Sequence, residues 1–217
     1  MERTAGRSEQ VAERRYRGRL PEERRAERRR RLLDAGLELF GTVGYHGTSI
    51  ERLCARAGVT ARHFYQEFPG REALLEALCE EIIAEVSQSV VKALAGAQGQ
   101  PPHTRTRAAL AAYVHGVLDD LRRARVVHVE MTGVSPELER TRRAMLQGFA
   151  SITQAEIERQ ADAGLIARRD YRLAALLAVG GTRELVMEWV SGERRPPLEE
   201  LIEELTRIFM AIAHQDH

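Results

Sequence analysis

Apolar residues return at helical spacing along most of the chain, and this periodicity restricts the possible folds more than any other feature. They recur every three or four residues, which is the spacing of one buried helix face. No segment shows the strict alternation of apolar and polar residues that a half-buried strand requires, and β-branched or aromatic clusters are few. Glycine and proline separate the periodic stretches. The sequence therefore predicts an all-α protein.

The breaks between these stretches predict where the helices begin and end. Residues 1–20 have no apolar stripe and carry six arginines, so we expect a flexible basic arm. Pro21 favours a helix start because proline fits the first turn, and the carboxylates of Glu22 and Glu23 favour the positive end of the helix dipole. The expected helices cover about 21–40, 48–57, 60–67, 70–95, 105–124, 126–131, 135–163, 171–190 and 198–213.

Positive charge is concentrated at the front of the chain. Residues 1–71 hold 16 arginines and 10 acidic residues, a net charge of +6, whereas residues 72–217 carry −5. Because a basic segment attracts polyanions, this asymmetry indicates that only the front meets one. Lysine occurs once among 33 basic residues, so the abundance of arginine is by itself weak evidence for a nucleic-acid partner.

Several classes of protein are disfavoured by what the sequence lacks. The longest apolar run, Leu173–Val179, is far shorter than the ~20 residues of a membrane-spanning helix. Residues 1–20 lack the apolar core of a signal peptide, so we expect a cytoplasmic protein. Cys54 and Cys79 have no metal-ligand spacing, which disfavours both a disulfide framework and a zinc site. We expect no metal and no cofactor.

The segment Ser49–Phe68, SIERLCARAGVTARHFYQEF, has the pattern of a helix-turn-helix. Cys54 supplies the small residue where the two helices touch, and Gly58 supplies a turn that favours a left-handed backbone. The second helix is then held outward by packing on the first, and such a helix fits the major groove of DNA. Its outward residues are Thr60, Ala61, Arg62, His63, Tyr65 and Gln66.

A longer run around this segment resembles the DNA-binding domain of the TetR family of transcriptional regulators. The matching motifs are LDAGLELF, GYHGTSI, RAGVT and FYQEFPGREAL, in the family's order and spacing, and they cover about a quarter of the chain. The resemblance implies a helix-turn-helix DNA-binding domain at 21–86 and an effector-binding and dimerisation domain at 87–217. It further implies a homodimeric repressor that a small molecule releases from a double-stranded, palindromic operator.

The resemblance also implies residue roles. Thr48, Thr60 and Tyr65 match positions that contact phosphates, and Arg71 stands where the family usually has a phosphate-binding lysine. Arg62 and His63 differ from the usual pair and are expected to select the operator, with Ala61 and Gln66 beside them on the same helix. Glu67 departs from the family pattern, which puts contacts by Gln66 and Glu67 in doubt.

Structural roles are open for some of these residues. Thr48 suits the N-cap of the following helix, forming a capping box with Glu51. Tyr65 fits a half-buried core position as well as an exposed one. The arginine run 24–31 is either a phosphate-steering patch or a solvated face paired with neighbouring glutamates.

We expect a largely apolar effector to bind inside the rear bundle, between the helices at 75–94, 105–124, 126–132, 135–163 and 171–190. Methionine and aromatic residues adapt to apolar ligands, and a few polar groups suffice to orient the guest. The alternative is that the same residues fill a solid core. The candidate ligand residues are Tyr113, His115, His128, Met131, Met145, Phe149, Met187 and Trp189.

The homodimer is expected to form through the last two long helices, about 171–190 and 198–213. The final helix carries seven bulky apolar residues, more than a helix at a domain edge requires. Gly180 and Gly181 would weaken a helix interior, so close approach of a partner helix is a reason for them. The alternatives are a kink or a place in the ligand pocket.

Two other classes of function remain as alternatives to a regulator. The first is a helical adaptor or scaffold. The second is a small all-α enzyme, which is disfavoured because the motifs GxGxxG, GxxxxGK[ST], HExxH and GxSxG are absent and because His128 and Glu130 point apart on a helix. An activator belongs to the same class as a repressor, and the sequence does not separate the two.

Overall fold

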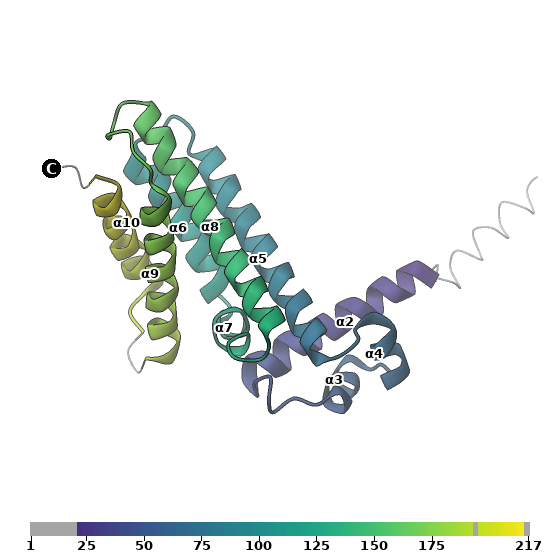
Figure 1. The fold of residues 1–217 in the computed structure, drawn as a ribbon. Helices are drawn as coiled ribbons and strands as arrows, with labels where there is room; N and C mark the ends of the chain where they lie inside the picture. The colour runs from purple at the N-terminus through teal and green to yellow at the C-terminus, as the bar shows by residue number, and fades with distance from the viewer. Residues whose placement is uncertain (1–20, 193–194, 215–217) are drawn as a thin grey trace, which may run out of the picture.

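The computed structural model describes residues 21–192 and 195–214, and the expected basic arm at 1–20 lies outside them. The described residues form helices and turns without a strand, as predicted (Figure 1). The helices are α2 (Pro21–Thr42), α3 (Ile50–Ala57), α4 (Ala61–Glu67), α5 (Arg71–Gly96), α6 (Pro102–Leu118), α7 (Leu121–Arg125), the π-helix η1 (Val126–Glu130), α8 (Pro136–Asp162), α9 (Arg172–Ser191) and α10 (Leu198–His214).

Helices α2, α3 and α4 gather at one end of the molecule around the buried Phe40, Leu53 and Phe64 (Figure 1). Gly58 ends α3 with φ 63°, a left-handed conformation that favours glycine because it has no Cβ. The predicted capping box on Thr48 is wrong. Ser49 caps α3 instead, its Oγ accepting a hydrogen bond from the Arg52 amide at 3.3 Å.

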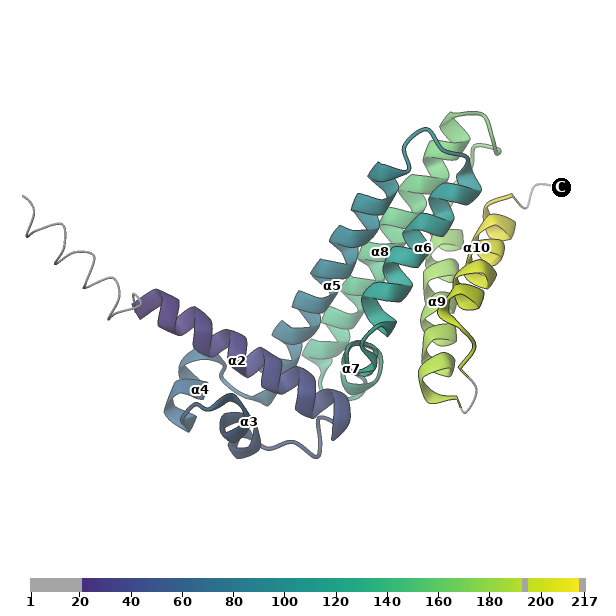
Figure 2. The ribbon, with the colours of Figure 1, turned by 180° about the vertical axis from the view of Figure 1, so that it is seen from behind.

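Helix α5 runs from the front domain along the rear bundle (Figures 1 and 2). Leu74 and Leu78, in its N-terminal part, are buried beside Gly36 of α2, and Val86 and Val90 are buried among the rear helices. The expected domain boundary after residue 86 therefore falls within one continuous helix.

The helix expected to reach residue 124 ends at Leu118. Asp120 starts a new helix there, because its Oδ1 accepts a hydrogen bond from the Arg122 amide at 3.0 Å and so caps α7. The short α7 then packs against α2. A Cβ placed on Gly41 in α2 would lie 2.4 Å from the Cβ of Arg122, so the glycine permits this close approach.

Helix α10 packs against α6 and α9 of its own chain (Figure 2). The seam that we expected at a dimer interface supplies the buried Leu201, Ile202 and Leu205 of the core. Three of the seven seam residues are therefore used within the chain, and a contribution of the rest of α10 to the dimer stays a prediction. A strongly amphipathic helix shows that one face is buried, but the pattern is the same whether that face packs on its own chain or on a partner.

Candidate DNA-binding surface and ligand cavity

Two buried aromatic residues fix the orientation of α4, so that its opposite face points outward. Phe64 and Phe68 are almost fully buried, with their ring centroids 6.1 Å apart. Thr60 caps the helix, its Oγ1 accepting a hydrogen bond from the His63 amide at 3.3 Å. Between these anchors the helix presents Tyr65, which is 58% exposed. Thr60, Ala61, Arg62 and Gln66 are exposed with it, and His63 is half-buried.

Glu67 does not belong to this outward surface. Its side chain is only 1% exposed and forms ion pairs with Arg25 at 3.0 Å and Arg28 at 3.7 Å, both in α2. The guanidinium of Arg29 lies 4.5 Å from the centroid of the Phe68 ring. Three residues of the arginine run thus hold α2 against α4, and the departure from the family pattern at Glu67 has a structural explanation.

Thr48 and Arg71 meet in the loop between α2 and α3. The Thr48 hydroxyl donates a hydrogen bond to the carbonyl of Gly44 at 2.8 Å, and the residue is 1% exposed. Arg71 donates from Nη1 to the carbonyls of Tyr45 and Thr48 and lies 4.8 Å from the Tyr45 ring centroid. In this conformation the Thr48 side chain has no surface to offer a phosphate, whereas Arg71 is half-buried and contact with DNA stays a prediction for it.

The rear bundle contacts this loop through η1. Glu130, the last residue of η1, accepts hydrogen bonds from the Tyr45 amide at 2.7 Å and from Nε of Arg125 at 2.8 Å. Nη1 of Arg125 also donates to the carbonyl of Thr42, in the last turn of α2. A π-helix is rare and is often found at a functional site. Here it connects the bundle interior to the front domain.

Two adjoining cavities lie inside the rear bundle, on either side of Tyr113 and Phe149, whose rings meet edge to face at 5.3 Å. The larger cavity has a volume of about 80 Å³ and lies between α5, α6, α8, α9 and α10. The smaller one, of about 40 Å³, is lined by His128 and by two arginines, Arg142 and Arg183. No acidic residue lines the smaller cavity in the described part of the chain.

Four of the eight predicted ligand residues line these cavities, namely Tyr113, His128, Met145 and Phe149. The other four lie elsewhere. Met131 is fully buried in the hydrophobic core, and Met187 is half-buried on α9 away from both cavities. His115 contacts Asp119 at 3.0 Å, and Trp189 donates from its indole nitrogen to the carbonyl of Pro196.

One wall of the larger cavity was not predicted from the sequence. Helix α10 contributes Phe209, Met210, Ile212 and Ala213 to the lining, although it was expected to lie outside the pocket. The spacing of Phe149, Thr153, Glu156 and Gln160 was an available signal, because residues three and four apart share one helix face.

His128 is neutral at physiological pH. Burial, and then the positive charge of Arg183, lower its pKa from 6.5 to about 4. Its Nε2 lies 3.4 Å from the Tyr113 hydroxyl, and its backbone carbonyl accepts a hydrogen bond from Arg183 at 3.2 Å. The wall of the smaller cavity therefore combines a neutral imidazole with two guanidinium groups.

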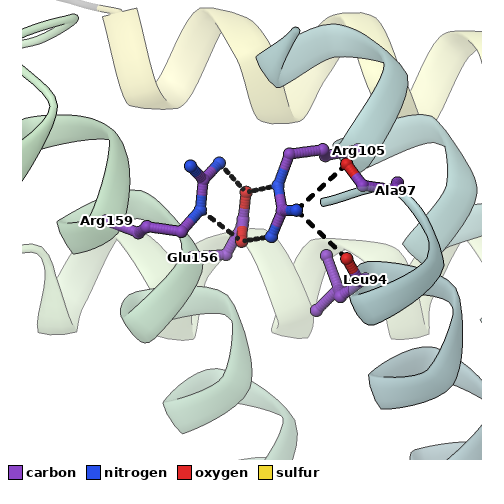
Figure 3. A network of polar contacts seen from close by, with 5 residues as sticks. All are labelled: Leu94, Ala97, Arg105, Glu156 and Arg159. Atoms are coloured by element: carbon purple, nitrogen blue, oxygen red, sulfur yellow. Dashed lines mark hydrogen bonds and ion pairs between the residues drawn. The ribbon is translucent and has the colours of Figure 1, made fainter. Parts of the chain in front are cut away.

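Glu156, in the lining of the larger cavity, is the centre of a polar network (Figure 3). The Glu156 carboxylate accepts hydrogen bonds from Arg105 at 2.8 and 2.7 Å and from Arg159 at 3.1 and 2.6 Å. Burial raises the pKa of Glu156, but these two arginines outweigh it and hold the pKa below its usual value. Arg105 also donates to the carbonyls of Leu94 and Ala97, at the end of α5.

Comparison with known families agrees with this geometry. Residues 32–78 match the bacterial regulatory proteins of the tetR family, and residues 99–213 match the tetracyclin repressor-like C-terminal domain. The second match alone covers more than half of the chain. The chain belongs to the TetR family.

Relatives of this TetR-family chain include regulators of known role. The fatty acid metabolism regulator protein of Bacillus subtilis is 23% identical over 186 residues, which are 84% of this chain and 94% of the relative. The HTH-type transcriptional regulator BetI of Escherichia coli is 36% identical over 67 residues, 31% of this chain and 34% of its own.

Solved structures share the fold of this TetR-family chain. The fatty acid degradation regulator FadR from Bacillus halodurans has a TM-score of 0.77 at 18% identity, covering 89% of this chain and 96% of that one. FadR from Bacillus subtilis, solved in complex with stearoyl-CoA, has a TM-score of 0.74 at 21% identity, covering 86% and 98%.

This TetR-family protein is a DNA-binding transcriptional regulator with a ligand-binding C-terminal domain. Members of the family form dimers and are generally regulators and not enzymes. Among the described helices, none is both long and apolar enough to cross a membrane.

Proposed function

We propose that the protein represses genes for the metabolism of long acyl chains, and that a long-chain acyl-CoA releases it from a palindromic operator. The observation that carries this proposal is how charged and apolar residues are distributed between the two cavities. The larger, mostly apolar cavity adjoins a smaller one that is lined by Arg142 and Arg183. No carboxylate is among the described residues that line the smaller cavity. Such a site suits a ligand with an apolar chain and an anionic head.

The two arginines stand at the edge of the site, where a charged head group keeps contact with water. The Arg142 side chain is 29% exposed and the Arg183 side chain 23% exposed. Each forms an ion pair with a neighbouring glutamate, Glu139 or Glu184, that is itself partly or fully exposed. Because exposed ion pairs contribute little free energy, phosphate groups can compete for these guanidinium groups.

The relatives support the same class of ligand. The Bacillus subtilis regulator, which this chain matches over almost the whole length of that regulator, is named for fatty acid metabolism. A FadR structure with this fold contains stearoyl-CoA. The burial of an apolar chain supplies most of the binding free energy for such a ligand, about 25 cal/mol per Å² of apolar surface removed from water. The arginines add orientation and selectivity for the anion.

The proposed operator symmetry follows from a dimer with one recognition helix in each protomer. Helix α9 offers an exposed apolar stripe for this dimer, formed by Leu173 (65% exposed), Leu177 (67%) and Leu185 (38%). Side chains at Gly180 and Gly181, in the same helix, would meet no neighbouring atom within 4 Å in the described part of the chain. The stripe lies on one side of α9, at spacings of four and eight residues.

The link between ligand and operator passes through η1. His128 lines the smaller cavity, and Glu130, two residues later, holds the Tyr45 amide of the front domain. A ligand that displaces His128 shifts η1 and changes the position of the front domain relative to its partner. The ligand acts only through its difference in affinity between the two states, typically about 1–3 kcal/mol.

The proposal is tested by measuring binding of the full chain to the DNA upstream of its own gene. Palmitoyl-CoA or stearoyl-CoA should weaken this binding roughly 5- to 150-fold, whereas coenzyme A alone should not. The double variant Arg142→Gln/Arg183→Gln should keep operator binding and lose affinity for the acyl-CoA. Arg140→Gln is the matched control, because Arg140 is an exposed residue of α8 that lines neither cavity. Operator binding that no acyl-CoA alters would contradict the proposal.

A further inference from the structure

Most residues that line the larger cavity are apolar, and three of its polar ones lie on α8 at eleven or more positions beyond Arg142. Thr153, Glu156 and Gln160 lie on one face of α8, and Thr106 stands next to Arg105 at the start of α6. Glu156 of this group is also the carboxylate at the centre of the network in Figure 3. A site that only held the end of a hydrocarbon chain would need no polar group there.

The charged residues near this part of the cavity, Glu156 and Arg105, already have hydrogen-bond partners in the protein. Glu156 accepts four hydrogen bonds from two arginines, which is the full capacity of a carboxylate. Arg105 donates to this carboxylate and to two backbone carbonyls of the α5 end. This part of the wall is stable without a ligand.

Gln160 differs from these neighbours. It is 2% exposed, lines the cavity, and its side-chain oxygen is buried without a hydrogen-bond partner among the described residues. Roughly 90% of buried polar groups in proteins are hydrogen-bonded, because an unpaired one has lost its water without replacement. The oxygen is itself covered, so a ligand group in the cavity would restore the missing bond once the Gln160 amide turns toward it.

The two cavities follow one another along α8, and a long chain enters them only when the surrounding helices move apart, because about 80 and 40 Å³ are small beside the roughly 300–1,000 Å³ of typical ligand sites. Gln160 lies eleven positions after Phe149, which stands between the two cavities, and this is about 16 Å along α8 at a rise of about 1.5 Å per residue. Arg142 lies a further seven residues back along the same helix. A ligand with its anionic head at Arg142 therefore has its chain terminus directed toward Gln160.

We infer that the cavity ends in a hydrogen-bonding subsite at Gln160 that binds a hydroxyl group at the end of the acyl chain. The inference rests on the proposed acyl-CoA function and narrows it to ω-hydroxylated acyl-CoA as the preferred effector. A hydroxyl both donates and accepts, so it pairs with Gln160 whichever way the amide is turned. A terminal carboxylate is disfavoured, because Arg105 already donates to Glu156 and to two backbone carbonyls, and Arg159 already donates to Glu156.

The test compares the CoA thioesters of lauric, myristic, palmitic and stearic acid with their ω-hydroxy and ω-carboxy derivatives. Dissociation constants are measured by calorimetry with the full-length protein, and operator release is measured in parallel. At the chain length that reaches Gln160, the hydroxylated thioester should bind about fivefold tighter than its parent, the usual effect of one added hydrogen bond. The ω-carboxy derivative should bind more weakly than the hydroxylated one.

Gln160→Leu should abolish or reverse this preference, because an apolar side chain of similar size favours the hydrocarbon terminus. Gln154→Leu is the matched control, since Gln154 is also on α8 but lines neither cavity and contacts Glu158 instead. It should keep the preference for the hydroxyl. The comparison of thioesters on the unaltered protein decides the inference even if Gln160→Leu does not fold.

The two proposals fail in different ways. If the parent thioesters bind and release the operator but no hydroxylated form is preferred at any length, the subsite is refuted and the acyl-CoA function stands. The same holds if Gln160→Leu folds and keeps the wild-type preference. If none of the thioesters binds, the acyl-CoA function is refuted, and the subsite inference with it.

Discussion

The carboxylate of Glu130 accepts a hydrogen bond from the backbone amide of Tyr45, with 2.7 Å between oxygen and nitrogen. The two residues are 85 positions apart and belong to different parts of the molecule. Tyr45 lies in the loop that Arg71 also holds, and Glu130 ends the π-helix whose His128 lines the smaller cavity. This hydrogen bond joins the ligand cavity to the DNA-binding domain through three consecutive residues of one short helix.

Glu130→Ala should reduce the response to acyl-CoA more than it reduces operator binding. Removing the carboxylate breaks the contact with Tyr45, so displacement of η1 no longer moves the front domain as strongly. The ligand-induced loss of operator affinity, typically about 1–3 kcal/mol, should fall clearly below the wild-type value in operator-binding titrations with and without palmitoyl-CoA. Glu137→Ala is the control, because its partner Arg140 lies three residues away on the surface of α8. An unchanged response would exclude this route of coupling.

Arg62→Ala should change the preferred operator sequence. The side chain is exposed on α4, where a guanidinium can reach base edges in the major groove. We expect a loss of about 1–3 kcal/mol at one base position of each half-site and little effect on other sequences. Binding selections from randomised operator libraries measure this directly. Arg140→Ala, which removes one positive charge from the rear bundle, should leave the preferred sequence as it is.

Gly41→Ala should destabilise the contact between α2 and α7. The new methyl group would lie 2.4 Å from Cβ and 2.8 Å from Cα of Arg122, so the backbone of α7 has to move. We expect the free energy of unfolding to fall by roughly 1–3 kcal/mol, the usual cost of overpacking. Gly36→Ala, in the same helix, would make ordinary contacts of 3.5 Å with Leu74 and should stabilise the protein by about 1 kcal/mol. Chemical denaturation measures the free energy of unfolding of both variants. Equal changes in the two would contradict the close approach of Gly41 and Arg122.

The buried His128 should make the protein less stable in acid. Its folded-state pKa of about 4 lies below the ordinary 6.5, so the unfolded chain binds the extra proton at intermediate pH. Its neutral form contributes up to about 3 kcal/mol of stability above pH 6.5, and this contribution is lost as the pH falls toward 4. His128→Gln should show a shallower loss of stability over this range than the wild type. If the free energy of unfolding falls equally with pH in the two proteins, His128 is not shielded from water.

Leu177→Glu should convert the dimer into monomers. Leu177 is 67% exposed at the centre of the α9 stripe, and a carboxylate on each side of a symmetric apolar interface is desolvated and repelled by its counterpart. Light scattering should then report the mass of a single chain, with the helix content of the wild type. Val91→Glu is the control, because Val91 is 53% exposed on α5, outside the stripe. A dimer that survives Leu177→Glu would place the interface on another surface.

The sequence by itself determined the helical architecture and the helix-turn-helix. These are local properties: Cys54 and Gly58 stand at the spacing that lets two short helices cross, and Phe64 and Phe68 recur on one face of the second helix. The outward position of Arg62, Tyr65 and Gln66 follows from the same periodicity. The ends of most helices were predictable for the same reason, since capping residues act within one turn.

Only the tertiary structure decided what each buried face packs against. The apolar pattern of α10 is the same whether that face packs on α6 or on a second protomer. Phe209 and Met210 line the cavity because α10 packs on its own chain. The family resemblance implies phosphate contacts for Thr48 and Arg71, and only the tertiary structure shows that both side chains also hold the loop between α2 and α3. The subsite at Gln160 depends on five helices at once, because whether a buried amide has a partner is set by atoms far away along the chain.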